Sequence, residues 1–262
     1  MSSTLERIVD RVREGLPALA GRRGELEAAA VARPSPPDLR AALRRATVGV
    51  VAELKPKSPS AGLVAPRIDP VSRARVCEAA GAAAIAVPTE EEHLGGAPSD
   101  LERVAGAVRV PLVRRDFILH ELQVIEARAS GASAVILMVR ALTPGELRGL
   151  LGAARSWGLQ ALVEAHDRRE VGAALAAGAT IVAVQGRDLR DVSGAAGTTW
   201  ALLGEIPAGV VAVAGSGIRD VRAVEAAAEA GADAVVVGSA LSAAGDPAAL
   251  LGAMAAVGRR GR

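Results

Sequence analysis

The segment AEAGADAVVVG at residues 228–238 decides the fold, because three other stretches of the chain follow the same pattern. They read EAAGAAAIAV at 78–87, ARASGASAVILMV at 127–139 and ALAAGATIVAV at 174–184. Each has an alanine-rich helix end, a glycine suited to a left-handed helix cap, and a β-branched run suited to a buried parallel strand. The repeat therefore predicts four copies of a helix-then-strand unit.

A second strand-like run precedes the glycine of each unit. These runs are VGVVAEL at 48–54, VPLVRRDF at 110–117, LQALVEA at 159–165 and GVVAVAGSG at 209–217. Eight strands that alternate with eight helical stretches indicate parallel strands joined by right-handed crossovers. Four such pairs favour a closed (β/α)8 barrel of the α/β class, a TIM barrel, and an open doubly wound sheet is the alternative.

The predicted strands place the remaining parts of the chain. They lie at or close to Glu53, Val87, Val113, Leu137, Val163, Val184, Ala212 and Val236. Residues 1–47 precede the first strand and carry helical patterning, which RPSPPD at 33–38 interrupts. We expect one domain over 1–262, in which an N-terminal helical extension (1–47) packs on the barrel (48–262).

Composition narrows the classes of partner. Half of the 262 residues are hydrophobic, 23% are charged and the formal net charge is only +2. No apolar run approaches the roughly 18 residues that a membrane span needs, and the charged N-terminus lacks a signal-peptide pattern. Interspersed charges and few aromatic residues also argue against nucleic-acid binding. We expect a cytoplasmic protein, without membrane or nucleic-acid partners, that is a monomer or a weak homo-oligomer.

Cysteine and histidine give little sign of metal or redox chemistry. The single cysteine, Cys77, lies among apolar neighbours, which favours a buried structural thiol over a nucleophile. His93, His120 and His166 are not spaced like metal ligands. We therefore expect no metal site and no cofactor.

Polar residues gather where the predicted strands end, the position at which barrels of this kind carry their chemistry. Glu53 and Lys55 follow the first strand and share its parity, so both side chains can point to the same side of the rim. Arg115 follows the third strand, and Glu164 ends the fifth. Surface ion pairs are the plain interpretation of each alone, but acidic and basic groups converging from three strands favour an acid/base site.

Two glycine-rich turns follow the last two strands. Gly215-Ser216-Gly217 and Gly238-Ser239 would present backbone N–H groups next to the start of a helix. Such turns bind anions, and two on consecutive strands form the phosphate site common in these barrels, although glycine also simply shapes loops. We expect a phosphorylated small-molecule substrate.

The stretch VVAELKPKSPSAG at 50–62 resembles the signature of the indole-3-glycerol-phosphate synthase family, and the resemblance covers nearly the whole chain. It is supported by residues 110–139, by ALVEAHD at 161–167, by GRDL at 186–189 and by GSGI at 215–218. The family resemblance implies a lyase of tryptophan biosynthesis. Enzymes of this family convert 1-(2-carboxyphenylamino)-1-deoxyribulose 5-phosphate to indole-3-glycerol phosphate. The reaction closes the indole ring, releases CO₂ and water, and needs no cofactor or metal.

The resemblance also implies roles for individual residues. Glu164 matches the general base, Arg115 occupies the position of the general acid, and Glu53 and Lys55 match the pair on the first strand. Phe117 matches an aromatic residue that packs against the anthranilate ring, although by itself it could equally be core. The remaining matches are substrate contacts at Ser58, Gln185, Arg187 and Ser216, and phosphate contacts at Gly217, Gly238 and Ser239.

Three positions depart from the pattern that the resemblance implies. Arg115 replaces a lysine, Gln185 an asparagine and Gly215 a glutamate. Arginine keeps its proton far above neutral pH and would need about 8 kcal/mol to release it at pH 7, so it can stabilise an oxyanion but is a poor proton donor. Gln185 keeps the amide on a longer stem, and Gly215 removes a carboxylate and leaves room.

These departures keep three hypotheses open. The first is the family reaction, with altered catalytic residues. The second is a diverged paralogue that forms an indole or a related ring from a different substrate in specialised metabolism. The third, from another functional class, is a sugar-phosphate-binding protein without catalysis. The first two require Glu164 as a base, whereas the third does not.

Overall fold

The computed structural model describes the chain except residues 1–3, 59–61, 64–68, 186–199 and 262. Among the described residues, eight parallel strands close into a barrel in the order β1-β10-β9-β8-β7-β6-β5-β4. The strands are β1 (Gly49–Glu53), β4 (Ala84–Pro88), β5 (Leu112–Arg115), β6 (Ala134–Met138), β7 (Gln160–Ala165), β8 (Ile181–Gln185), β9 (Val211–Gly215) and β10 (Ala234–Val237). This confirms the predicted TIM barrel and excludes an open sheet.

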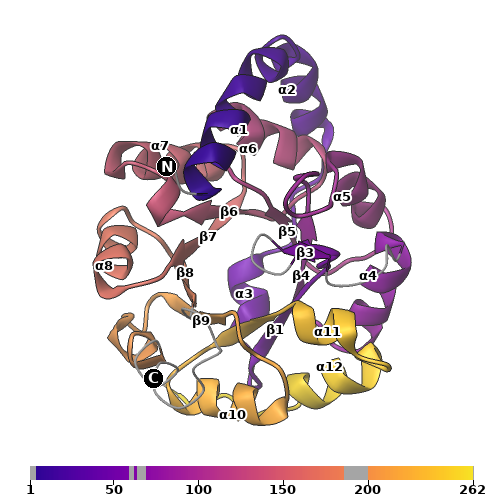
Figure 1. Cartoon of the computed structure of the whole chain (residues 1–262), viewed down its shortest axis with the longest axis vertical. Coiled ribbons are helices and arrows are strands. Elements are labelled where there is room, and N and C mark those ends of the chain that lie inside the picture. The colour runs from indigo at the N-terminus through magenta and orange to yellow at the C-terminus, as the bar shows by residue number, and fades with distance from the viewer. Residues whose placement is uncertain (1–3, 59–61, 64–68, 186–199, 262) are drawn as a thin grey trace.

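Helices surround the ring of strands (Figure 1). Around the barrel lie α4 (Pro70–Ala79), α5 (Pro98–Ala105), α6 (Glu121–Ala129), α7 (Pro144–Ser156), α8 (Arg168–Ala176), α10 (Val221–Glu229), α11 (Ser239–Ala243) and α12 (Pro247–Ala255). Short 3-10 turns are η1 (Val139–Ala141) and η2 (Leu203–Glu205), and β2 (Lys57–Ser58) pairs antiparallel with β3 (Gly62–Leu63). The predicted helical stretch between β8 and β9 falls largely within 186–199, outside the described residues.

The four repeated glycines adopt the left-handed backbone conformation that the sequence pattern predicts. Gly81, Gly131, Gly178 and Gly231 have φ values of 96°, 91°, 88° and 96°. Each follows the end of a helix and begins the turn into a strand. A left-handed backbone strains residues that carry a Cβ, so glycine is the residue that allows this reversal four times over.

Alternation along the strands divides the core into two. One cluster, which includes Val50, Ala52 and Leu137, lies between the strands and the surrounding helices. The other includes Val51, Ile136 and residues of the same parity on every strand, and it fills the barrel. Because side chains alternate along a strand, the last residue of inward parity on each strand faces the barrel mouth.

The N-terminal segment supplies three helices, which lie at different places. Helices α1 (Thr4–Ala20) and α2 (Arg23–Ala32) lie over α6 at one side of the ring. Helix α3 (Leu39–Leu43) instead lies within the ring in projection (Figure 1). Helices α1 and α2 therefore pack on the outside of the barrel, whereas α3 closes one of its mouths.

Candidate active site at the C-terminal mouth of the barrel

In four of the strands, the last side chain that faces the inside of the barrel is polar. Glu53, Arg115, Glu164 and Gln185 are the last inward positions of β1, β5, β7 and β8. Their side chains meet at the C-terminal mouth, which is the end of the barrel at which such folds place their active sites. The convergence expected from the sequence is therefore present.

The first part of this cluster is a row of ion pairs from β1 to β5. Glu53 Oε2 lies 3.5 Å from Lys55 Nζ, and its other oxygen, Oε1, lies 3.4 Å from Arg115 Nε. The Glu53 side chain is 9% exposed, whereas Lys55 and Arg115 are 22% and 20% exposed. The two cations thus keep contact with the open mouth while the carboxylate that joins them is buried.

The second part is centred on Glu164, whose side chain is only 5% exposed. Arg115 Nη1 lies 3.2 Å from Oε2 of this carboxylate, and Gln185 Nε2 donates a hydrogen bond of 2.7 Å to Oε1. Both oxygens are therefore held. A carboxylate has about four lone-pair positions, so it still has acceptor capacity for a proton from a bound substrate.

Arg115 stays a cation in this setting. Burial disfavours its charge, but the carboxylates of Glu164 and Glu53 outweigh burial and raise the pKa of the guanidinium above its ordinary value. A side chain of this kind offers a permanent positive charge next to Glu164. The geometry suits stabilisation of a developing negative charge rather than donation of a proton.

Glycine at the ends of β9 and β10 makes space for these side chains. A Cβ on Gly215 would lie 2.6–2.7 Å from the amide atoms of Gln185, so the room expected at this position is filled by Gln185. A Cβ on Gly238 would collide with the Glu53 carboxylate and would lie 3.0 Å from the Lys55 side chain. Both glycines therefore have a steric reason that the sequence did not reveal.

The turn after β9 has an unusual backbone. Ser216 has φ 56° and Gly217 has φ 78°, so two consecutive residues are in the left-handed region, where a non-glycine residue is uncommon. Strain of this kind concentrates at functional sites. Gly238 caps α11, Ser239 begins it, and β9 is the neighbour of β10. The two turns predicted to bind phosphate are thus on adjacent strands, and phosphate binding stays a prediction.

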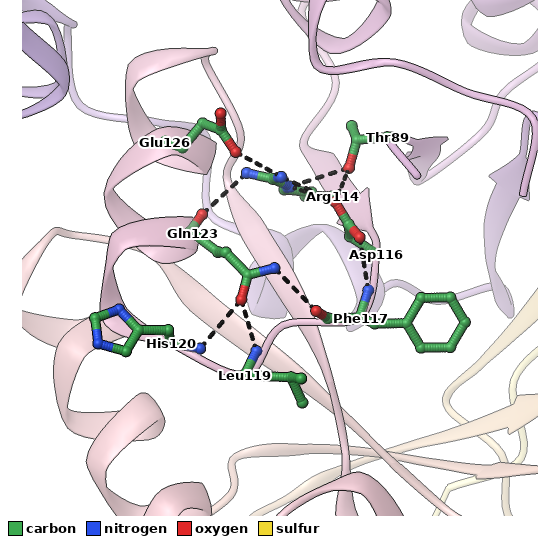
Figure 2. A network of polar contacts seen from close by, with 8 residues as sticks. All are labelled: Thr89, Arg114, Asp116, Phe117, Leu119, His120, Gln123 and Glu126. Atoms are coloured by element: carbon green, nitrogen blue, oxygen red, sulfur yellow. Dashed lines mark hydrogen bonds and ion pairs between the residues drawn. The ribbon is translucent and has the colours of Figure 1, made fainter. Parts of the chain in front are cut away.

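A buried polar network supports the segment that follows β5 (Figure 2). Arg114, of outward parity, pairs with Asp116 Oδ2 at 2.8 Å and with Glu126 Oε2 of α6 at 2.7 Å. Its Nε also donates to Thr89 Oγ1 at 3.0 Å. Burial opposes the charge of Arg114, but the two carboxylates together raise its pKa. The network ties α6 to the strand end that presents Arg115.

The same network holds the backbone around Phe117. Its N–H donates to Asp116 Oδ1 at 2.7 Å, and its carbonyl accepts from Gln123 Nε2 at 2.9 Å. The ring points away from the network (Figure 2) and joins the cluster inside the barrel, which includes Leu94 and Met138. Phe117 is 6% exposed, so in this state it is part of the core as well as a neighbour of the mouth.

Other candidates are only partly placed. Ser58 lies in the β2–β3 hairpin after β1, opposite Gly62. Arg187 lies outside the described residues. Helix α1 contacts the rim: Arg11 pairs with Glu92 after β4, and Arg13 lies 3.8 Å from Glu146 at the start of α7. The sequence did not predict this contact, because nothing in the local pattern shows which loops a distant helix reaches.

Burial shifts the pKa of two further side chains, Cys77 and His166. Cys77 is buried, as expected, and burial raises the pKa of its thiol to about 11. His166 lies beside Glu170, at 3.2 Å, and burial together with Arg140 lowers its pKa. Within the described residues, no helix is both long and apolar enough to span a membrane.

The fold and the charged cluster at its C-terminal mouth define the class: a (β/α)8 barrel with the site architecture of barrel enzymes. The sequence model of indole-3-glycerol phosphate synthase matches residues 5–254. The chain belongs to this family.

Individual relatives support the assignment. The chain is 45% identical over 221 residues to indole-3-glycerol phosphate synthase 2 of Streptomyces coelicolor, which covers 83% of this chain and 84% of that protein. It is 44% identical to indole-3-glycerol phosphate synthase of Parafrankia sp., over 94% of this chain and 92% of that one. The enzyme of Mycobacterium ulcerans is 40% identical, with 98% and 95% covered.

Solved structures show likeness of fold at low sequence identity. A 3-hexulose-6-phosphate synthase superposes with a TM-score of 0.65 at 18% identity, over 80% of this chain and 99% of that chain. The enzyme of the same name from Salmonella typhimurium gives a TM-score of 0.65 at 16% identity, over 79% and 97%. At these identities the likeness concerns the barrel alone.

Proposed function

We propose that this chain is a lyase of tryptophan biosynthesis that converts 1-(2-carboxyphenylamino)-1-deoxyribulose 5-phosphate to indole-3-glycerol phosphate. The aryl carbon that bears the carboxylate bonds to the ketone carbon, CO₂ leaves from the aryl carbon, and the resulting hydroxyl leaves as water. The observation that carries the proposal is Glu164 held at the barrel mouth beside Arg115, in a chain of this family.

In this reaction Glu164 acts as the base. Its carboxylate is buried and has acceptor capacity left, so a proton released by the substrate can be received there. Arg115 stabilises the negative charge that develops on the ketone oxygen, as a fixed cation 3.2 Å from Glu164. Lys55 contributes a second positive charge at the mouth, and Glu53 holds both cations in place.

The rest of the mouth binds the substrate. We assign the phosphate to the backbone of the turns at Gly217, Gly238 and Ser239, with Ser58, Ser216 and Arg187 as further contacts. Phe117 forms an apolar wall for the aryl ring. This reaction would proceed with catalytic residues altered from the family pattern, because Arg115 replaces a proton donor by a fixed charge.

The test is direct turnover. Purified protein is incubated with the carboxyphenylamino substrate, and product is followed by its indole fluorescence. We expect turnover above background that Glu164→Gln lowers by about 10²- to 10⁴-fold. If the substrate binds and no product forms, the proposal is wrong.

A second candidate is a diverged paralogue that acts on a different aryl-amino substrate in specialised metabolism. It is favoured by one observation, namely that the three departing positions are connected: Arg115 and Gln185 contact Glu164, and Gly215 lies against the Gln185 amide. Restoring lysine, asparagine and glutamate at these positions together should then raise activity on the family substrate. No increase in that activity would remove the support for retuned chemistry.

A further inference from the structure

The amide of Gln185 connects the ends of three strands. It begins at the end of β8, lies over the end of β9, and donates to Glu164 Oε1 near the end of β7. Gln185 and Gly215 are register partners in the β8–β9 pair, so their Cα atoms face each other directly. The amide therefore packs against Gly215 on one side and donates a hydrogen bond to Glu164 on the other.

Glycine at 215 leaves the space that the Gln185 amide occupies, and the backbone conformation does not call for glycine there. Gly217 has a left-handed φ, but Gly215 does not, so an alanine at 215 would meet no conformational penalty of that kind. The nearest obstacles to a Cβ there are Cδ, Nε2 and Oε1 of Gln185, all at 2.6–2.7 Å. Real Cβ atoms do not approach other atoms so closely, so any larger residue would force the amide to move.

The amide also completes a clamp on Glu164. Arg115 approaches Oε2 at 3.2 Å and Gln185 approaches Oε1 at 2.7 Å, from β5 and β8 respectively. Two donors on opposite oxygens restrict rotation of the carboxyl group about its last bond. A base whose direction is restricted in this way is oriented before the substrate arrives.

We infer that Gln185 is a positioning residue for Glu164, and that Gly215 is present to admit its amide, so that the two residues act as one unit. The inference rests on the proposed function, because it concerns the orientation of the base in that reaction. It differs from a role for Gln185 as a substrate contact: a positioning residue acts on the chemical step, whereas a substrate contact acts on binding.

The first test separates these roles by kinetics. Gln185→Met keeps the length of the side chain and removes the donor. We expect kcat to fall about 10- to 100-fold, because a misdirected base loses rate steeply, with KM changed less than about threefold. A rise in KM at unchanged kcat would identify a substrate contact and overturn the inference. Thermal unfolding of each variant confirms that the protein measured is folded.

The second test is a double-mutant cycle between 185 and 215. Gly215→Ala should lower kcat about tenfold where Gln185 is present, and change it less than about twofold in a Gln185→Ala background, where the obstacle is gone. Gly209→Ala is the matched control, since Gly209 has open space around its Cβ position and no left-handed φ. We expect that control to leave kcat unchanged.

The outcomes distinguish the inference from the proposed function. Independent, multiplicative effects of the 185 and 215 substitutions in an active wild-type enzyme would overturn the inference alone. An inactive wild-type enzyme that binds the substrate would overturn the proposed function, and the role of Gln185 with it.

Discussion

The two mouths of the barrel both hold buried carboxylates, but they hold them differently. At the C-terminal mouth, Glu164 is bound by two side chains, Arg115 and Gln185. At the N-terminal end, Asp233 accepts the backbone N–H of Ala212 at 2.9 Å and pairs with Arg259 at 2.9 Å. One partner of Asp233 is thus a backbone N–H, which cannot turn to another acceptor, whereas both described partners of Glu164 are side chains.

The mouths also differ in how they are closed. The N-terminal mouth is closed by α3, whose Leu39 and Leu43 are fully buried inside the barrel. Arg40 donates to the carbonyl of Gly209 at 2.7 Å, and its N–H donates to Gln160 Oε1 at 3.0 Å, which attaches α3 to the segments where β9 and β7 begin. The N-terminal mouth is thus closed by buried side chains, whereas the carboxylate at the C-terminal mouth is held by side chains that border the place at which such barrels bind their substrates.

The largest expected effect is at the C-terminal mouth. Glu164→Gln removes the base but keeps the shape of the side chain, and the new side-chain oxygen can still accept the hydrogen bond from the Gln185 amide. We expect kcat to fall about 10²- to 10⁴-fold, the usual contribution of general base catalysis, with little change in the free energy of unfolding. Steady-state kinetics and urea unfolding measure the two quantities. Retained activity would show that the carboxylate at this mouth is structural as well.

The next effect is expected at the opposite mouth. Leu43→Ala would leave a cavity in the closure of the barrel and lower the free energy of unfolding by about 3 kcal/mol. Activity of the folded variant at a temperature well below its unfolding transition should stay within about twofold of wild type. A selective loss of activity without a loss of stability would contradict the division between the mouths.

A smaller loss of stability is expected from Asp233→Ala. The variant leaves the Ala212 N–H and Arg259 without their acceptor, which should cost about 2 kcal/mol in urea unfolding. The kinetic constants should again be unchanged. A fall in kcat that accompanies the loss in free energy of unfolding would contradict this expectation, because it would mean that Asp233 affects the catalytic mouth.

The smallest effect concerns Cys77, which lines a pocket together with Leu54 and Lys55 close behind the C-terminal mouth. Burial raises its thiol pKa to about 11, so the reactive thiolate is scarce at pH 8. Labelling of the native protein by a disulfide reagent should be over about 100-fold slower than that of a free thiol. Protein unfolded in guanidinium is the control and should label promptly.

The sequence predicted those features that depend on local patterns. All eight strand positions were correct, because four strands are apolar runs after a capping glycine, as at Gly81 and Gly231, and the other four are apolar runs spaced between them. The convergence of Glu53, Arg115 and Glu164 was also predictable, because parity and strand ends follow from the barrel itself. Their catalytic roles remain predictions.

Features that depend on contacts between distant segments were not predictable. The break at RPSPPD was visible, but nothing local shows that α3 closes a mouth of the barrel. Gly215 was expected to leave room, whereas the register that places it opposite Gln185 fills that room. Arg114 is adjacent to Arg115 in sequence, and only strand parity sends it to Glu126 on α6 instead of into the mouth.

The close approach of Gln185 to Gly215 has a consequence for how this chain can change by mutation. With the long amide in place, any side chain added at 215 meets it and displaces it from its position at Glu164, unless position 185 becomes shorter as well. In the opposite direction, an amide at 185 can take this position only where 215 carries no side chain. The effects of the two positions are therefore coupled, and mutant libraries that vary them one at a time will miss combinations in which the two changes compensate each other.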